Sequence, residues 1–253
     1  MYCKLLYHYN ILLLKPRYGI KRIIEENLDL KSIACMLFLV GLIRGTLETV
    51  WLYLIVGKFS KLILSLRSLD WYLFNSGPFI VGNITSVYFL WMLVAFIVFK
   101  FGRFLGGRGN FNDMLKVYGI FMISYALIGV INYVHVLVDM PFVCFKASEY
   151  FNPAIGVGQE IVFLWLIVIS YFVARDLHNL SRTDSILISS LPVLVGITLY
   201  IISVSLFFSF YKLLPFKVGL TSYFLSGILY VIFTSVLSVI LFKWGKDHNN
   251  FMF

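Results

Sequence analysis

The sequence predicts an all-helical integral membrane protein with about six transmembrane helices. Its 253 residues are 60% hydrophobic and only 13% charged, whereas soluble domains average roughly half and a quarter. So few charged residues cannot cover a water-exposed surface, and apolar stretches long enough to cross a bilayer recur along the chain. The composition therefore excludes soluble, disordered and disulfide-stapled classes of protein.

Six stretches have the roughly 20 predominantly apolar residues that a spanning helix needs. They are Ile33–Val56, Phe79–Phe101, Val117–Val138, Ile155–Ala174, Ile186–Tyr211 and Val218–Phe242. The first stretch is too long for the core of a signal peptide, so we expect it to be retained. We assign the spans to one domain, residues 33–245, with an N-terminal segment at 1–32 and a tail at 246–253.

Residues that favour helix ends and turns lie beside these spans. Asn152 followed by Pro153 is a typical start for the fourth helix, with an N-cap and a proline in the first turn. Ser181 and Asp184 have the spacing of a capping box before the fifth helix. The sequence Asn-Ser-Gly-Pro at 75–78 predicts a turn immediately before the second.

Two amphipathic segments are predicted to lie along the membrane surface rather than to cross it. Residues 58–74 place leucines, Ile63 and Phe59 on one helical face and lysines and serines on the other. In the N-terminal segment, Ile20, Ile23 and Leu28 share a face that charged residues flank. A connector covered by neighbouring helices would show the same pattern, so both interpretations stay open.

The distribution of cations predicts the orientation. Six of the 21 Lys and Arg residues fall on one side of the spans, namely Lys58, Lys61, Arg67, Lys146, Lys212 and Lys217. Fourteen fall on the other side, together with both termini, and Arg44 lies inside the first span. Because cytoplasmic loops carry the excess of Lys and Arg, we expect both termini to be cytoplasmic. The net charge of +9 therefore indicates contact with anionic lipid headgroups and not with nucleic acid.

No motif in the chain predicts a cofactor. The three cysteines, Cys3, Cys35 and Cys144, have no metal-ligand spacing and form no disulfide framework. A His-Glu-x-x-His motif is also absent, and the four histidines are scattered. We therefore predict no metal, no cofactor and no enzymatic activity.

Several segments of the chain resemble one family of membrane proteins. Residues Phe104–Gly119 read FLGGRGNFNDMLKVYG, which is similar to the Gly-Gly-Lys/Arg-Gly turn of the Ypt-interacting-protein (Yip) domain family. Leu164–Trp165 and Ala174–Ser181 resemble the family's Trp-containing helix and its v-h-g-l-s exit. Pro16 with Ile23–Glu25 is similar to the N-terminal entry of bacterial and archaeal members.

This resemblance implies a multi-pass membrane protein of the prokaryotic branch, with a location in the plasma membrane. The best-known role of the family is interaction with Rab-type small GTPases. Eukaryotic members carry a long hydrophilic N-terminus with an Asp-Leu-Tyr-Gly-Pro motif, which this chain lacks. We therefore do not predict small-GTPase binding.

The family-like turn motif consists of Gly106, Gly107, Arg108, Gly109 and Phe111. Its glycines can adopt positive φ and close a tight corner between two helices, after which Asn110 can cap the next helix. A phosphate site is the alternative, because Arg108 lies beside free backbone N–H groups. We favour the corner, since no strand and no Gly-Lys-Ser/Thr sequence accompanies it.

Polar residues within the spans form a second candidate site. Ionisable groups in hydrocarbon are costly unless they are paired, so each is a functional candidate. With cytoplasmic termini, one cluster in the outer half of the membrane could contain Arg44, Glu48, Asn132, His135, Gln159 and Glu160. Arg44 and Glu48 are four residues apart and could pair on one helical face. The cluster predicts either hydrogen bonding between helices or a proton or cation pathway.

These observations favour a non-enzymatic membrane scaffold or adaptor that presents basic cytoplasmic loops to the lipid bilayer or to another protein. The alternative is a transporter or permease-like component that uses the intramembrane polar cluster. Gly41 and Gly45 predict close helix packing, either inside one bundle or in a dimer.

Overall fold

The structure is a computed structural model, and it describes residues 2–26, 28–59, 69–139, 153–213, 232 and 235–245. The described residues form helices and short connections, with no strand among them. The helices are α1 (Tyr2–Leu14), α2 (Pro16–Glu25), α3 (Leu30–Phe59), α4 (Leu69–Phe104), α5 (Phe111–Asp139), α6 (Pro153–Phe172) and α7 (Arg182–Leu213). A π-helical turn, Val173–Leu177, follows α6, and a C-terminal helix covers Ser235–Gly245.

The predicted all-helical membrane architecture is confirmed. Within the described residues, Leu30–Val50, Ile80–Phe104 and Phe111–Ile128 are long and apolar enough to cross a bilayer. The first five predicted spans coincide with α3 to α7, the fourth running on into the π-helical turn. Most of the sixth, Val218–Phe242, lies outside the described residues, so the number of six spans stays a prediction.

Two predicted helix starts agree with the structure. Pro153 is the first residue of α6, although Asn152 lies outside the described residues. Before α7, the backbone N–H of Asp184 donates to the Ser181 hydroxyl oxygen at 3.2 Å, and that hydroxyl donates to the Asp184 carboxylate at 2.6 Å. Ser181 therefore caps α7, as the capping-box spacing predicted.

The predicted turn at 75–78 is wrong, because α4 runs without a break through these residues. Glycine and proline are tolerated inside membrane helices, where neighbouring groups satisfy the freed backbone atoms, so the local turn signal misleads here. The amphipathic segment 58–74 is also not a separate helix where it is described. Lys58 and Phe59 end α3, residues 69–74 begin α4, and 60–68 lie outside the described residues.

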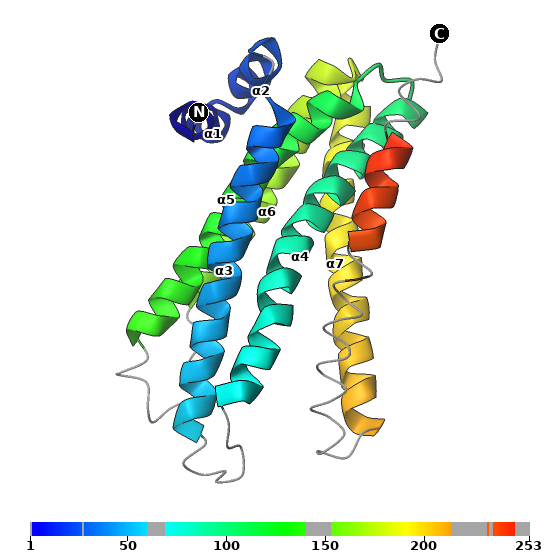
Figure 1. Cartoon of the computed structure of the whole chain (residues 1–253). Helices are drawn as coiled ribbons and strands as arrows, with labels where there is room; N and C mark the ends of the chain where they lie inside the picture. The colour runs from blue at the N-terminus through cyan, green and yellow to red at the C-terminus, as the bar shows by residue number, and fades with distance from the viewer. Residues whose placement is uncertain are drawn as a thin grey trace.

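Helices α3 to α7 run alongside one another as a bundle, and α1 and α2 lie across one of its ends (Figure 1). Helix α2 contacts α5 and α6, and Ile20 and Ile23 on its apolar face are fully buried. This apolar face therefore packs on the bundle, which supports the interpretation of this segment as a connector covered by neighbouring helices. The sequence had not predicted α1.

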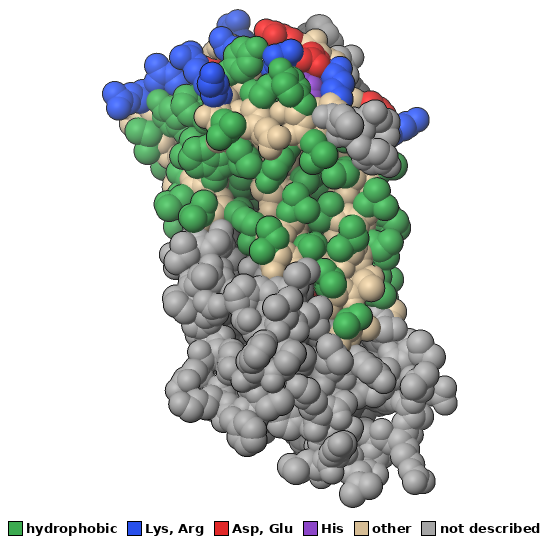
Figure 2. Space-filling view, turned by 90° about the vertical axis from the view of Figure 1, so that its left-hand side faces the viewer, with side chains coloured by type: hydrophobic (Ala, Val, Ile, Leu, Met, Phe, Trp, Pro, Cys, Tyr) green, Lys and Arg blue, Asp and Glu red, His purple; other side chains and the backbone are tan. Residues whose placement is uncertain are grey.

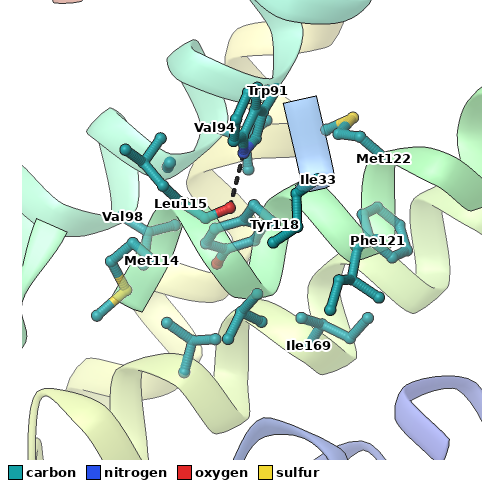
Figure 3. Close-up of a cluster of buried hydrophobic side chains, with 14 of the residues drawn as sticks. Ile33, Trp91, Val94, Val98, Met114, Leu115, Tyr118, Phe121, Met122 and Ile169 are labelled. Carbon is teal, nitrogen blue, oxygen red and sulfur yellow. Dashed lines mark hydrogen bonds between the residues drawn. The ribbon is translucent and has the colours of Figure 1, made fainter. Parts of the chain in front are cut away.

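The centre of the bundle is the first half of α5, where nearly every residue from Phe111 to Ala126 is buried. Figure 3 shows Tyr118 of α5 among apolar side chains from α3, α4 and α6. Two hydrogen bonds cross this core. The Trp91 indole N–H donates to the Leu115 carbonyl oxygen at 2.8 Å, and the Tyr118 hydroxyl donates to the Ser170 hydroxyl oxygen at 2.9 Å. These two bonds pair buried polar groups of neighbouring helices.

Gly41 and Gly45 allow α3 to pack closely against α4. A Cβ atom on Gly45 would lie 2.7 Å from the Ile80 Cα, and one on Gly41 would lie 3.1 Å from the Ile84 Cα. The contact is with a helix of the same chain. The two glycines therefore serve packing inside the bundle, which is the first of the two predicted alternatives.

Candidate functional site

The family-like turn motif forms a tight corner between α4 and α5. Gly106 has φ of +85° and so adopts the left-handed conformation that the sequence predicted for the glycines of the motif, whereas Gly107 and Gly109, which were predicted to share it, do not. The backbone N–H of Gly107 donates to the Gly102 carbonyl oxygen at 2.8 Å and closes the corner. Asn110 then caps α5 through a bond from the Asn112 N–H to its side-chain oxygen at 3.0 Å.

His178 fills the inside of this corner. Its Nδ1 accepts the backbone N–H of Gly109 at 3.2 Å, and its carbonyl oxygen accepts the N–H of Arg108 at 3.2 Å. A Cβ atom on Gly102 or Gly107 would lie only 2.5 or 2.7 Å from the His178 side chain. The glycines at these positions are therefore needed because the imidazole approaches the backbone closely.

The π-helical turn at the end of α6 places His178 in the corner. The His178 N–H donates to the Val173 carbonyl oxygen at 3.3 Å, five residues back. Asn179 follows with φ of 55°, a left-handed conformation that asparagine tolerates and that ends the helix. Turns of the π type inside α-helices occur frequently at functional sites. His178 and Asn179 fall in the segment that resembles the family's v-h-g-l-s exit, but sequence reasoning did not select His178.

The environment of His178 favours its neutral form. Burial and, to a smaller extent, the nearby Arg103 charge together lower its pKa from 6.5 to about 4. Because Nδ1 accepts the Gly109 N–H, we assign the ring proton of the neutral imidazole to Nε2. His178 therefore acts near neutral pH as a buried acceptor that fixes the corner.

Glu26 holds α1 and α2 together over this end of the bundle. Its carboxylate contacts the Lys4 ammonium at 3.0 Å, the His8 Nε2 at 3.1 Å and the Arg22 Nε at 2.7 Å. Hydrogen bonds from Arg22 and then from Lys4 lower the Glu26 pKa from 4.5 to about 2. The two helices also cross closely, because a Cβ atom on Gly19 would lie 2.7 Å from the Leu12 Cα.

An exposed ion pair connects α2 to the π-helical turn. The Arg17 guanidinium donates to the Asp176 carboxylate twice, at 3.0 Å from Nε and 3.2 Å from Nη2. Asp176 lies two residues before His178. The α1–α2 pair and the glycine corner therefore belong to one continuous end of the molecule.

Several cations at this end are exposed. Lys15, Lys21 and Arg108 make no ion pair with any described residue. A hollow of about 450 Å³ lies between the start of α2 and the end of α6, lined by Lys15, Pro16, Arg17, Tyr18, Lys21 and Phe172. Figure 2 shows Lys and Arg side chains gathered over this end, with hydrophobic side chains covering the described wall below it. We call Lys15, Lys21 and Arg108 the cationic platform.

A family model described as the Yip1 domain matches residues 10–204 of the chain. The chain belongs to the Yip1 domain family. No curated protein and no solved structure matches it. The match to the Yip1 domain covers α2 to α6, the glycine corner, His178 and most of α7.

The predicted intramembrane polar cluster is described only in part. Glu48 of α3 accepts a hydrogen bond from the Asn83 side-chain amide of α4, and the Arg44 guanidinium lies 5.5 Å from the centre of the Tyr125 ring. The structure gives no ion pair between Arg44 and Glu48, although both side chains are described. Glu48 thus bonds to the neighbouring helix instead of to Arg44. The side chains of the remaining four, Asn132, His135, Gln159 and Glu160, lie outside the described residues.

Valine in place of Gly107 is expected to lower the thermal stability of the detergent-solubilised protein, because a Cβ there would overlap the Gly102 carbonyl oxygen and His178. Alanine in place of Arg108 should leave the melting temperature nearly unchanged, since that side chain is exposed and makes no ion pair with a described residue. Thermal unfolding of both variants in the same detergent checks this. A large loss of stability in Arg108→Ala would instead favour the alternative of an anion bound at the corner.

Glu26 is expected to make the attachment of α1 sensitive to acid. A carboxyl group whose folded-state pKa is lowered contributes stability above its unfolded pKa of 4.5, and it loses that contribution as the pH falls towards 2. The difference in thermal stability between the wild type and Glu26→Gln should therefore be constant above about pH 5.5 and disappear towards pH 2. A difference that does not change with pH would show that Glu26 acts through contacts other than its charge.

Proposed function

We propose that this Yip1-family protein is a non-enzymatic membrane scaffold or adaptor. Its bundle crosses the membrane six times, both termini are cytoplasmic, and the cationic platform binds anionic lipid headgroups together with a cytoplasmic or membrane protein partner. The supporting observation is that Lys15, Lys21 and Arg108 are exposed on one end of the bundle, above a described wall of hydrophobic side chains, without ion-pair partners among the described residues. Basic groups at the cytoplasmic surface are each worth about 1 kcal/mol of attraction to anionic lipid.

The ion pairs of this end support a role as a rigid docking surface. Glu26 pairs with Lys4 and Arg22, and Asp176 pairs with Arg17, so these two carboxylates hold the helices of this end in place. The cations of the platform are left to interact with other molecules. His178 fixes the loop that carries Arg108, because its carbonyl oxygen accepts the Arg108 N–H.

The experiment is purification of the full chain from its native membrane in mild detergent, followed by identification of co-purifying proteins and lipids. We expect a defined protein or an excess of anionic lipid to co-purify with the wild type and to be lost in the double variant Lys15→Gln/Lys21→Gln. Lys243→Gln is the matched control, because Lys243 is exposed and lies outside the hollow beside α2. An identical set of proteins and lipids from the wild type and the platform variant would contradict the proposal.

A transport component is the second candidate, and the polar contact between α3 and α4 is the observation that favours it. Glu48 and Asn83 meet within two segments that are apolar enough to span the membrane. A pathway would make Glu48 reachable by water. Proton or cation uptake into proteoliposomes that is lost in Glu48→Gln would therefore favour transport over the scaffold.

A further inference from the structure

A groove opens along the flank of the bundle, beside α4. Its floor is α4, and its walls are the start of α3 and the C-terminal helix, which flank α4 in Figure 1. The groove has a volume of about 480 Å³, within the roughly 300–1,000 Å³ of small-molecule sites. It is lined by Leu30, Lys31, Ala34, Thr85, Tyr88, Trp91, Met92, Leu115, Ser235, Ser238, Val239 and Phe242.

The packing of the C-terminal helix gives the groove a defined wall. Trp244 stacks on Phe96 of α4 with ring centroids 5.1 Å apart, and the Lys100 ammonium lies 4.7 Å from the centre of the Trp244 ring. Gly245 packs directly against Phe111, since a Cβ there would overlap the Phe111 ring. These contacts hold the C-terminal helix against α4 and the start of α5.

The aromatic side chains of the groove present apolar surface because their polar atoms are already bonded. The Tyr88 hydroxyl donates to the Ala34 carbonyl oxygen at 2.6 Å, and the Trp91 N–H donates to the Leu115 carbonyl oxygen at 2.8 Å. The Thr85 hydroxyl donates to the Gly82 carbonyl oxygen at 3.2 Å. The groove thus favours a hydrocarbon ligand over a polar solute.

One cation lines the groove. Lys31, in the first turn of α3, is exposed, and no described carboxylate lies within 4 Å of its ammonium. Asp29, two residues before it, interacts with its charge over a longer distance. The floor belongs to Ile80–Phe104, which is apolar enough to lie in a bilayer. Lipid is the most abundant ligand that a groove in this position can meet. An acyl chain matches its apolar surface, and a phosphate matches the Lys31 charge.

We propose that this groove binds an anionic phospholipid, with one acyl chain lying on α4 between α3 and the C-terminal helix and the phosphate at Lys31. The site adds a specific lipid to the proposed function. It does not depend on Lys15, Lys21 or Arg108, so either assignment can fail while the other holds.

The test uses the full chain in phosphatidylcholine nanodiscs that contain a little phosphatidylglycerol with a photoreactive diazirine in one acyl chain. After illumination, mass spectrometry should place the label on peptides that contain residues 85–92 and 235–242. Unlabelled phosphatidylglycerol should compete better than phosphatidylcholine. Lys31→Gln should reduce that preference about fivefold, the effect of one basic group near the surface.

Two variants fill the groove from opposite walls. Ala34→Phe and Val239→Phe should each reduce labelling of residues 85–92 several-fold. Val239 is 66% exposed, so its substitution leaves the core intact even where Ala34→Phe disturbs folding. Val236→Phe is the matched control, because Val236 is 52% exposed on the same helix but does not line the groove. The proposal would be overturned if both groove-filling variants left the labelling unchanged, or if Val236→Phe reduced the labelling equally. It would also be overturned if phosphatidylcholine competed as well as phosphatidylglycerol.

Discussion

Leucine in place of His178 is expected to cost the protein several kcal/mol of stability at pH 7.5. Leucine keeps the corner apolar, but it removes the acceptor of the buried Gly109 N–H, and an unsatisfied buried donor costs about 1–3 kcal/mol. Leucine also has no atoms at the positions of Cε1 and Nε2, the ring atoms nearest to Gly102, so it fills the corner less completely than the imidazole does. Asparagine is the informative comparison, because its side-chain oxygen can replace Nδ1 as acceptor. We expect thermal stability to decrease from the wild type to His178→Asn and further to His178→Leu.

The same histidine should make the wild type sensitive to mild acid. A base whose folded-state pKa is lowered contributes stability above its unfolded pKa of 6.5, and that contribution is lost as the pH falls towards 4. The depression corresponds to about 3 kcal/mol. The melting temperature of the wild type should therefore decrease as the pH is lowered from 6.5 to 4, and that of His178→Asn should decrease less. Parallel pH profiles would contradict the role of His178 as a buried neutral acceptor.

Alanine in place of Gly45 is expected to be the most damaging small substitution in the bundle. The added Cβ would lie 2.7 Å from the Ile80 Cα and 3.1 Å from its carbonyl oxygen. Backbone atoms cannot move aside as a flexible side chain can, so α3 and α4 must separate. Overpacking of this kind costs about 1–3 kcal/mol. Thermal unfolding in detergent measures the loss.

Gly196→Ala is the matched control for this substitution. Gly196 lies in α7, and nothing occupies the space within 4 Å that its Cβ would take. Because alanine favours a helix by up to about 1 kcal/mol over glycine, this variant should be as stable as the wild type or more stable. Similar losses in Gly45→Ala and Gly196→Ala would show that helix packing is not the reason for Gly45.

The features that were predictable from the sequence depend on local or periodic signals. The lengths of the apolar stretches located α3 to α7, and the Ser181 and Asn110 caps follow from neighbouring residues. The same local logic gave the wrong turn at 75–78, because glycine and proline end helices in water more reliably than in a bilayer.

Tertiary contacts could not be predicted in the same way. His178 lies 69 residues from Gly109, and no periodicity relates the two. The bond from Asn83 to Glu48 likewise depends on how α3 meets α4, so helical spacing alone suggested Arg44 as the partner. The one signal in the sequence that could have indicated His178 is its position in the segment that resembles the family's exit from the Trp-containing helix.

The most direct test of the account is the sidedness of the two ends of the bundle. Reporter fusions or single cysteines at Arg108 and at Lys146 can be assayed in intact cells. Six spans with cytoplasmic termini place Arg108, and with it the cationic platform, in the cytoplasm and Lys146 on the opposite side. Both positions on the same side would contradict the six-span bundle, and Arg108 outside the cell would contradict the cytoplasmic lipid-binding and partner-binding role.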